Sequence, residues 1–374
     1  MKNKIGIVGG GQLGRMLTDA AHKLGFTVFV LDPTPNSPAG QVADQQIVGS
    51  FKDKEKIKIL AEQVDFLTFE IELANAEILS KLSNKVKINP SARTLTIIKD
   101  KLFQKQFLKK SKIPTADFIE VKTKKDIISA GKRFGYPLML KARLDAYDGR
   151  GNALIKNEKD ISRAMHKLKG RLLYLEKYVP FTQELAIMVV RNTKGEIKTY
   201  PVVATTHIRN ICNTVIIPAQ INITIQKSAK KLAKEVMKHL EGAGVFGIEM
   251  FLTTDSKILV NEIAPRVHNS GHYTIEACVT SQFEQHIRAI TGMPLGSTKM
   301  IVKAAAMINI LGRSSAKAQL RGLKKVLGVA NATLHIYGKS ETRIDRKMGH
   351  ITVVGNTTNE VIQKATKARE MITI

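Results

Sequence analysis

Two glutamates close together in the chain are the residues best suited to chemistry. Glu249 lies in the apolar run 247–251, and Glu262 follows thirteen positions later in a second apolar run. Residues 253–257 between them have the composition of a hairpin turn, so the two carboxylates are expected side by side on paired strands. Hard cations such as Mg²⁺ take carboxylate and phosphate oxygens. The pair predicts a metal–nucleotide clamp, with two solvated hairpin carboxylates as the alternative.

A second group of residues is suited to holding phosphates. Lys141 ends an apolar run that is expected to form a strand, and the glycine-rich stretch 146–152 follows it. Backbone N–H groups of such a loop can close over phosphates, and the lysine adds a point charge. An ordinary hairpin turn with a surface lysine is the alternative.

Two further segments can contact a nucleotide or a phosphorylated substrate. Residues 176–179 end an expected strand, and their backbone could bond a purine edge while Glu184 holds ribose hydroxyls; exposed carboxylates are the alternative. Near the C-terminus, four cations gather on one expected hairpin, where they could receive a phosphate: Lys339, Arg343, Arg346 and Lys347. A solvated basic turn is the alternative there.

These segments need elements that position them. Residues 5–8, 15–24 and 27–31 predict a strand, a helix and a second strand, and the loop Gly9–Gly14 between them fits the pattern G-x-G-x-x-G. Taken alone, this loop with Asp32 after the second strand indicates a dinucleotide-binding enzyme. Many βαβ domains carry such loops, and nothing downstream resembles hydride-transfer machinery.

The remaining pattern predicts α+β units after the first domain. The turn-forming residues Asn89-Pro90-Ser91 mark the end of the first domain. Antiparallel strands are expected over 184–218, and an amphipathic helix is expected over 225–240. The polar face of that helix carries five lysines, which we interpret as a solvated face.

Composition bounds the class of protein. The chain has 374 residues, enough for two or three domains, and no apolar run long enough to span a bilayer. Cys212 and Cys278 stand alone, which fits a reducing, cytoplasmic location. The net charge is +27, yet aromatic residues are 5% and the lysines are spread along the chain, so a nucleic-acid partner is not expected.

Taken together, these residues resemble the ATP-grasp superfamily and, within it, the N5-carboxyaminoimidazole ribonucleotide synthetase family. The motifs that carry the resemblance are GGGQLGRM at 9–16, YDGRGN at 147–152, NEIAPRVHNSGH at 261–272, SQFEQHIRAITGMPLG at 281–296 and RKMGH ending at His350. The resemblance implies a Rossmann-like N-terminal domain over 1–95, an ATP-grasp domain over 96–300 with a small lobe at about 115–178, and a small C-terminal α+β domain over 301–374.

The resemblance also assigns roles to residues. It implies that Arg266, Lys141 and Asn269 are catalytic and that Glu249 and Glu262 bind Mg²⁺, with Mn²⁺ as an alternative ion. It implies ATP contacts at Lys101, Lys141, Ala146, Tyr147, Asp148, Gly149, Arg150, Gly151, Asn152, Glu176, Lys177, Tyr178, Val179, Glu184, His207, Asn261 and Glu262. It implies contacts to the carboxyl acceptor at Gln12, Asn269, Ser270, Lys339, Arg343 and Arg346.

The function implied is the ATP- and bicarbonate-dependent carboxylation of 5-aminoimidazole ribonucleotide through carboxyphosphate, in purine biosynthesis. Another ATP-grasp ligase or carboxylase with a different acceptor, and a non-catalytic nucleotide- or nucleic-acid-binding protein, are the alternatives. A homodimer is expected, and because no mutase-type domain follows residue 374, a separate mutase is expected to take the product. The chain departs from many relatives at Leu144-Asp145-Ala146 and at Lys101, which bears on fine ATP contacts, and it also departs from them at Leu73.

Overall fold

A parallel five-stranded sheet opens the fold of the computed structural model, which describes residues 3–145 and 151–374. Its strand order is β3-β2-β1-β4-β5, and β1, β2 and β4 are buried along most of their length because helices cover the sheet. The elements are β1 Lys4–Val8, α1 Gln12–Lys23, β2 Thr27–Asp32, β3 Gln45–Val48, α2 Lys54–Glu62, β4 Phe66–Phe69, α3 Ala76–Leu82, β5 Lys87–Ile88 and α4 Ala92–Lys99. This is the Rossmann-like arrangement expected from the sequence.

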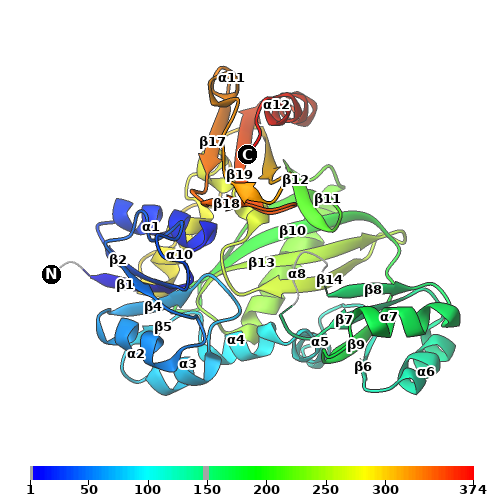
Figure 1. The fold of residues 1–374 in the computed structure, drawn as a ribbon. Helices are drawn as coiled ribbons and strands as arrows, with labels where there is room; N and C mark the ends of the chain where they lie inside the picture. The colour runs from blue at the N-terminus through cyan, green and yellow to red at the C-terminus, as the bar shows by residue number, and fades with distance from the viewer. Residues whose placement is uncertain (1–2, 146–150) are drawn as a thin grey trace.

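A small α+β lobe follows, at the right of Figure 1. Helix α5, Lys101–Lys110, leads into a four-stranded sheet of order β6-β9-β7-β8. Its elements are β6 Phe118–Val121, α6 Lys124–Phe134, β7 Leu138–Ala142, β8 Asn152–Ile155, η1 Glu158–Asp160, α7 Ile161–Lys167 and β9 Leu173–Lys177. Along β7, buried Leu138 and Leu140 alternate with half-buried Met139 and Lys141, so the Lys141 side chain leaves the lobe's core.

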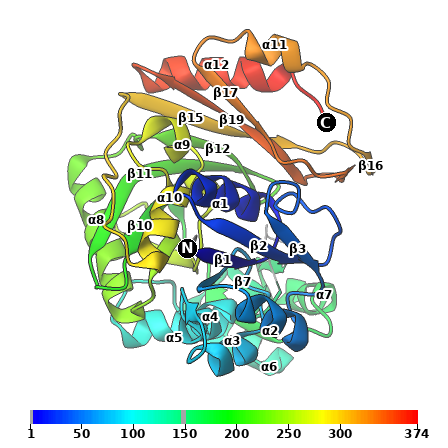
Figure 2. The same ribbon diagram turned by 90° about the vertical axis from the view of Figure 1, so that its left-hand side faces the viewer.

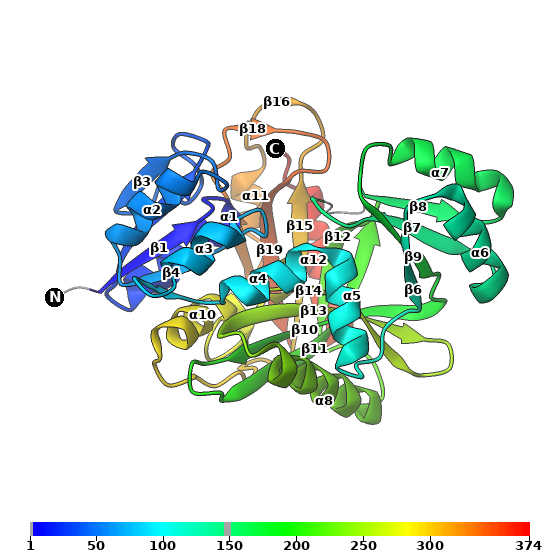
Figure 3. The ribbon, with the colours of Figure 1, turned by 90° about the horizontal axis from the view of Figure 1, so that it is seen from below.

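The centre of the molecule is an eight-stranded sheet of order β14-β13-β10-β11-β12-β15-β19-β17. Helix α8, Ile223–Leu240, covers one face with its apolar side, as seen below the sheet in Figure 3. The strands are β10 Phe181–Arg191, β11 Ile197–Ile208, β12 Ile211–Ile217, β13 Gly244–Thr253, β14 Ile258–Ala264, β15 Ala304–Leu311, β17 Ala332–Ile336 and β19 Lys347–Gly355.

The C-terminal strands are therefore part of the central sheet. Strand β12 pairs with β15 in antiparallel register, which joins the last segment to the middle of the chain. Helix α12, Thr358–Glu370, packs on β15 and β19 at the outer end, as Figure 2 shows. Shorter elements complete this part: η2 Asn269–Gly271, α9 Thr274–Ala277, α10 Gln282–Thr291, β16 Ala316–Lys317, α11 Leu323–Leu327 and β18 Glu341–Thr342.

Helix α10 joins the first sheet to the central one. His286 on this helix is fully buried; its Nε2 lies 2.9 Å from Thr68 Oγ1 on β4, and its Nδ1 accepts from the backbone N–H of Val245 on β13 at 3.1 Å. One apolar cluster runs from α1 and β1 through α10 to β10 and β11. Across the described ranges, none of the helices combines the length and apolarity needed to cross a membrane.

Candidate active site

The two glutamates stand opposite each other at the pairing of β13 and β14. Glu249 and Glu262 are register partners, as the hairpin pattern predicted. The register then shifts, so that Asn261 is the extra residue of a β-bulge beside Glu262. Burial raises the pKa of Glu249 to about 7, and the neighbouring negative charge of Glu262 acts in the same direction. Two carboxylates held this close are stabilised by a cation between or beside them.

The Glu249 and Glu262 carboxylates suit a magnesium ion that is also coordinated by phosphate oxygens. Among the described residues, no group of three or more His, Cys, Asp and Glu side chains is arranged to hold a metal by itself. Mg²⁺ is commonly bound by one or two carboxylates together with substrate phosphates and water. The Glu249–Glu262 pair matches this type of site.

Three lysines lie on the small-lobe side of the site, one in contact with Glu262 and two in contact with Glu176. Lys101, the first residue of α5, hydrogen bonds through Nζ to Glu262 Oε1. Glu176 on β9 lies between two ammonium groups, with Lys105 Nζ at 3.0 Å and Lys141 Nζ at 2.7 Å. Burial raises the pKa of Glu176, but Lys105 and Lys141 outweigh it and lower the pKa to about 2. The Glu176 carboxyl is therefore ionised throughout the neutral range.

The far wall of this region comes from β10 and β11. Glu184 Oε2 lies 2.5 Å from His207 Nδ1. Burial lowers the pKa of His207, but the hydrogen bond and charge of Glu184 outweigh it and raise the pKa above its usual value. Lys177 ends β9, and Tyr178 begins the linker to β10. Both already donate their backbone N–H groups, to the carbonyls of Asp117 and Pro137. Val179 follows them and is half-buried.

Arg266 marks the side of the site that faces the first sheet. Its Nη2 lies 3.0 Å from Glu72 Oε1, and its Nη1 donates to the carbonyl of Val267. Burial raises the pKa of Glu72, but Arg266 and Lys101 outweigh it, so the carboxyl stays ionised. Glu72 had no assigned role from the sequence. Its position shortly after β4 was the available signal, because ligands gather at the carboxyl ends of parallel strands.

The segment after Arg266 is held by buried polar contacts. Asn269 and Asn309 exchange side-chain hydrogen bonds of 3.0 and 2.7 Å, and Asn309 also donates to the carbonyl of Cys212. His268 Nδ1 lies 2.9 Å from Ser270 Oγ, and its Nε2 lies 3.7 Å from Glu249 Oε1. Asn269 and Ser270 are buried. This segment therefore connects the carboxylate pair with the Arg266 side of the site.

The glycine loop is closed by protein groups, which corrects its dinucleotide interpretation. Glu70 accepts from the backbone N–H of Gly11 at 2.5 Å and of Gly14 at 2.9 Å, and Asp32 accepts from Gly10 at 2.8 Å. A carboxylate thus takes the helix N-terminus where a pyrophosphate would bind. Gln12, the first residue of α1, is half-buried, and within residues 3–145 and 151–374 no side-chain hydrogen bond or ion pair joins it to another candidate residue.

The basic run near the C-terminus makes more contacts within the protein than the hairpin tip expected from the sequence. Strands β17 and β19 do pair, but β18 lies between them in sequence and pairs with β16. Lys339 Nζ donates to the carbonyl of Lys347 at 2.7 Å, and Arg346 Nη1 donates to that of Glu341 at 2.7 Å. The Arg343 side chain is 69% exposed and lies 3.5 Å from Glu341. Asp345 in the same run is paired with Arg209 from the β11–β12 turn.

The glycine-rich loop is described only in part. Ala146, Tyr147, Asp148, Gly149 and Arg150 lie outside the described residues. At the loop's end, the carbonyl of Gly151 accepts from the N–H of Ala142, and Asn152 is the register partner of Lys141. The end of the loop is thus fixed next to Lys141.

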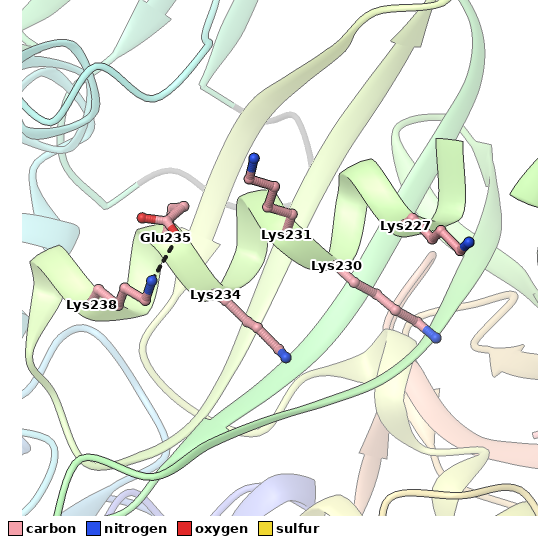
Figure 4. Close-up of a pocket in the computed structure, with 6 residues that line it drawn as sticks. All are labelled: Lys227, Lys230, Lys231, Lys234, Glu235 and Lys238. Carbon is pink, nitrogen blue, oxygen red and sulfur yellow. Dashed lines mark hydrogen bonds and ion pairs between the residues drawn. The ribbon is translucent and has the colours of Figure 1, made fainter. Parts of the chain in front are cut away.

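A basic hollow of about 290 Å³ lies apart from these residues, on α8. It is lined by Lys227, Lys230, Lys231, Lys234, Glu235 and Lys238. Figure 4 shows that Lys231 points to the opposite side from Lys230 and Lys234, while Lys238 pairs with Glu235. Diverging lysines on an exposed helix face do not form a site, in agreement with the solvated face expected from the sequence.

Comparison with known families covers most of the chain in three blocks. Residues 1–99 match the ribonucleotide synthetase preATP-grasp domain, and residues 106–283 match the ATP-grasp domain. Residues 305–364 match the phosphoribosylaminoimidazole carboxylase C-terminal domain.

Individual relatives agree with these blocks. The N5-carboxyaminoimidazole ribonucleotide synthase of Bacillus subtilis is 40% identical over 362 residues, which are 97% of this chain and 94% of the relative. The phosphoribosylaminoimidazole carboxylase of Ogataea methanolica is 45% identical over 94% of this chain. The chain spans 66% of that fungal relative's length and 63% of that of its Candida albicans counterpart.

Solved structures show the same fold. The N5-carboxyaminoimidazole ribonucleotide synthetase of Thermotoga maritima superposes with a TM-score of 0.90 at 51% identity, covering 100% of this chain and 99% of that one. The Aspergillus clavatus N5-carboxyaminoimidazole synthase, solved with ADP and 5-aminoimidazole ribonucleotide, gives a TM-score of 0.92 at 38% identity, covering 99% and 98%.

Proposed function

Because the chain belongs to the N5-carboxyaminoimidazole ribonucleotide synthetase family of ATP-grasp ligases, we propose that it carboxylates 5-aminoimidazole ribonucleotide at the expense of ATP. The observation that carries the proposal is the paired Glu249 and Glu262 at one sheet register, with Lys101, Lys141 and Glu176 on one side and Arg266 on the other. In this arrangement the lysine side suits a nucleotide's phosphates, and the Arg266 side suits a second anion.

The proposed reaction has two bond-forming steps. A bicarbonate oxygen attacks the γ-phosphorus of ATP, the bond to the β-phosphate oxygen breaks, and ADP and carboxyphosphate form. Carboxyphosphate releases phosphate and CO₂, and the exocyclic amine of the ribonucleotide then bonds to the carboxyl carbon and loses a proton. Phosphoryl transfer of this kind depends on positioning and charge neutralisation.

The residues on the nucleotide side would bind and orient ATP. Lys141 and Lys101 supply positive charge to the phosphates, and the Glu184–His207 pair lies where a ribose and a base edge could be held. Val179 is the linker residue favoured for a base contact, since Lys177 and Tyr178 have donated their N–H groups elsewhere. Mg²⁺ on Glu249 and Glu262 would supply further neutralisation of the polyphosphate.

The residues on the acceptor side would receive bicarbonate and the ribonucleotide. Arg266 keeps its charge beside Glu72, and Asn269 and Ser270 lie next to it in the chain. Burial lowers the pKa of Arg266, but Glu72 and the other carboxylates nearby outweigh it and raise the pKa. Arg343 and the run around it are proposed to take the 5′-phosphate, as an exposed cation can.

The test is a substrate panel with ADP release as the readout. We expect ATP consumption to require both bicarbonate and 5-aminoimidazole ribonucleotide. Glycinamide ribonucleotide and amino acids serve as competing acceptors, and turnover with one of these instead would replace the proposed acceptor while keeping the ATP-grasp chemistry.

A homodimer is also proposed. The dimer is supported by a pair of exposed apolar side chains, Val279 at 58% and Ile301 at 63%, on neighbouring hydrogen-bonded segments. Light scattering on the full chain and on Ile301→Lys tests it: a dimer that the substitution splits supports this surface.

A further inference from the structure

Helix α5 carries a second lysine, one turn after Lys101, whose role the family resemblance leaves open. Lys105 is 2% exposed. Residues four apart lie on one face of a helix, so Lys101 and Lys105 project in the same direction. Lys101 reaches Glu262 on the central sheet, and Lys105 reaches Glu176 in the small lobe. The helix thus places one ammonium on Glu262 and one on Glu176.

Lys105 is held more firmly than the other lysine on Glu176. Lys105 Nζ forms an ion pair with Glu176 Oε1 at 3.0 Å, and it donates hydrogen bonds to Thr115 Oγ1 at 2.8 Å and to the Val260 carbonyl at 3.5 Å. Its side chain is 3% exposed, against 16% for Lys141. Val260 lies two residues before Glu262. Lys105 therefore has an ion-pair partner in the small lobe and two hydrogen-bond acceptors, one in the connecting segment and one on β14.

The charges of the three groups leave one positive charge available. Two ammonium groups and one carboxylate sum to +1 as long as Lys105 is present. Without Lys105, Glu176 and Lys141 would form a closed pair with no net charge. A phosphate would then have to compete with a buried carboxylate for the Lys141 ammonium, which is costly where water cannot replace the lost partner.

We propose that Lys105 is a positioning residue that neutralises Glu176 and so leaves the Lys141 ammonium free to bind nucleotide phosphate. The proposal rests on the proposed function only in taking this region as the nucleotide site. It concerns nucleotide binding and makes no assumption about the acceptor.

The test compares Lys105→Met with Lys105→Arg, which keeps a positive charge beside Glu176, in the full chain. Lys105→Met should raise the Kd for Mg²⁺-ADP, measured by calorimetry, and the KM for ATP by about tenfold, the order expected for one charge-assisted contact. The KM for 5-aminoimidazole ribonucleotide should change less than about twofold on the same reasoning. Lys105→Arg keeps the charge sum at +1, so its ADP affinity should stay close to that of the unmodified chain.

Lys238→Met makes the same chemical change on the exposed face of α8 and is the matched control, with no expected change in either affinity. Circular dichroism checks folding. If Lys105→Met does not fold, Lys105→Gln decides, because it keeps a donor near Thr115 and Val260 without the charge: a tenfold loss of ADP affinity supports the proposal and near-normal affinity overturns it. A Lys105→Met variant with lowered Tm but normal ADP affinity would show that Lys105 is structural only. Because ADP binding needs no acceptor, a wrong acceptor assignment leaves this test intact.

Discussion

At the scale of single residues, Glu262 has two neighbours with opposite effects. Lys101 donates a hydrogen bond to it, while the Glu249 carboxylate stands opposite it on β13. The lysine alone cannot neutralise both carboxylates, and burial already raises the pKa of Glu249 to about 7. A bound cation would relieve the repulsion, which makes the charge of Glu262 a requirement for the proposed metal site.

We predict that Glu262→Gln lowers turnover by at least about a hundredfold, because an anionic ligand for Mg²⁺ is lost. The measurement is ADP release as a function of Mg²⁺ concentration. Asp255→Asn, in the exposed turn of the same hairpin, is the control and should keep normal turnover. Normal turnover of Glu262→Gln at ordinary Mg²⁺ would remove this residue from the metal site.

At the scale of elements, the loop from β1 to α1 is shaped by side chains that fill it. A Cβ added at Gly10 would lie 2.4 Å from Ser37 Oγ and 2.8 Å from Asp32 Cβ. Glycine is required there because Asp32 and Glu70 approach the backbone to accept its N–H groups. The same closeness leaves no room for a pyrophosphate.

Gly10→Ala is therefore expected to destabilise the fold by about 1–3 kcal/mol, as overpacking of a buried site does. Thermal unfolding measures it. Gly328→Ala is the control, because its Cβ would meet its nearest neighbour at an ordinary 3.5 Å. Tight binding of a nicotinamide dinucleotide by the unmodified chain would contradict the view that this loop is closed.

The run that carries Lys339, Arg343 and Arg346 is a second element with a testable role. Arg343 is exposed, so its loss should leave the fold intact. We predict that Arg343→Ala raises the KM for 5-aminoimidazole ribonucleotide by about tenfold, with the KM for ATP unchanged. Arg163→Ala, on α7 with its side chain 80% exposed, is the control for loss of a surface charge. A rise in the ATP KM instead would assign the run to the nucleotide site.

At the scale of the whole molecule, His286 joins two sheets through one buried imidazole. Burial lowers its pKa to about 3. Between pH 3 and the ordinary value near 6.5, the unfolded chain binds a proton at this residue and the folded chain does not. Acidification therefore stabilises the unfolded state relative to the folded state. The free energy of unfolding falls by up to about 1.4 kcal/mol per pH unit in this window.

We predict that His286→Gln makes the fall of Tm between pH 7 and pH 4 shallower than in the unmodified chain, although the variant starts lower. Thermal unfolding at several pH values measures the slope. His239→Gln, on the exposed surface of α8, should leave the slope unchanged. Equal slopes for His286→Gln and the unmodified chain would exclude His286 as a source of acid sensitivity.

The sequence by itself determined the local features. The hairpin that pairs Glu249 with Glu262, the parallel β1–α1–β2 unit, the helix over 225–240 and the family all follow from residue types and spacing, because period, turn chemistry and motifs act over short stretches. The same local signals suggested a dinucleotide at the glycine loop; the rest of the sequence argued against it, but only the structure shows which groups close the loop.

Only the tertiary structure decided which distant residues meet. Glu70, 56 positions from Gly14, closes the glycine loop, and Lys105 reaches Glu176 on another lobe. Arg266 finds Glu72, and Asn269 finds Asn309 through the join of β12 to β15. These contacts depend on how sheets pack and in which order strands pair. A buried charge needs its partner in space, and no spacing along the chain encodes where that partner comes from.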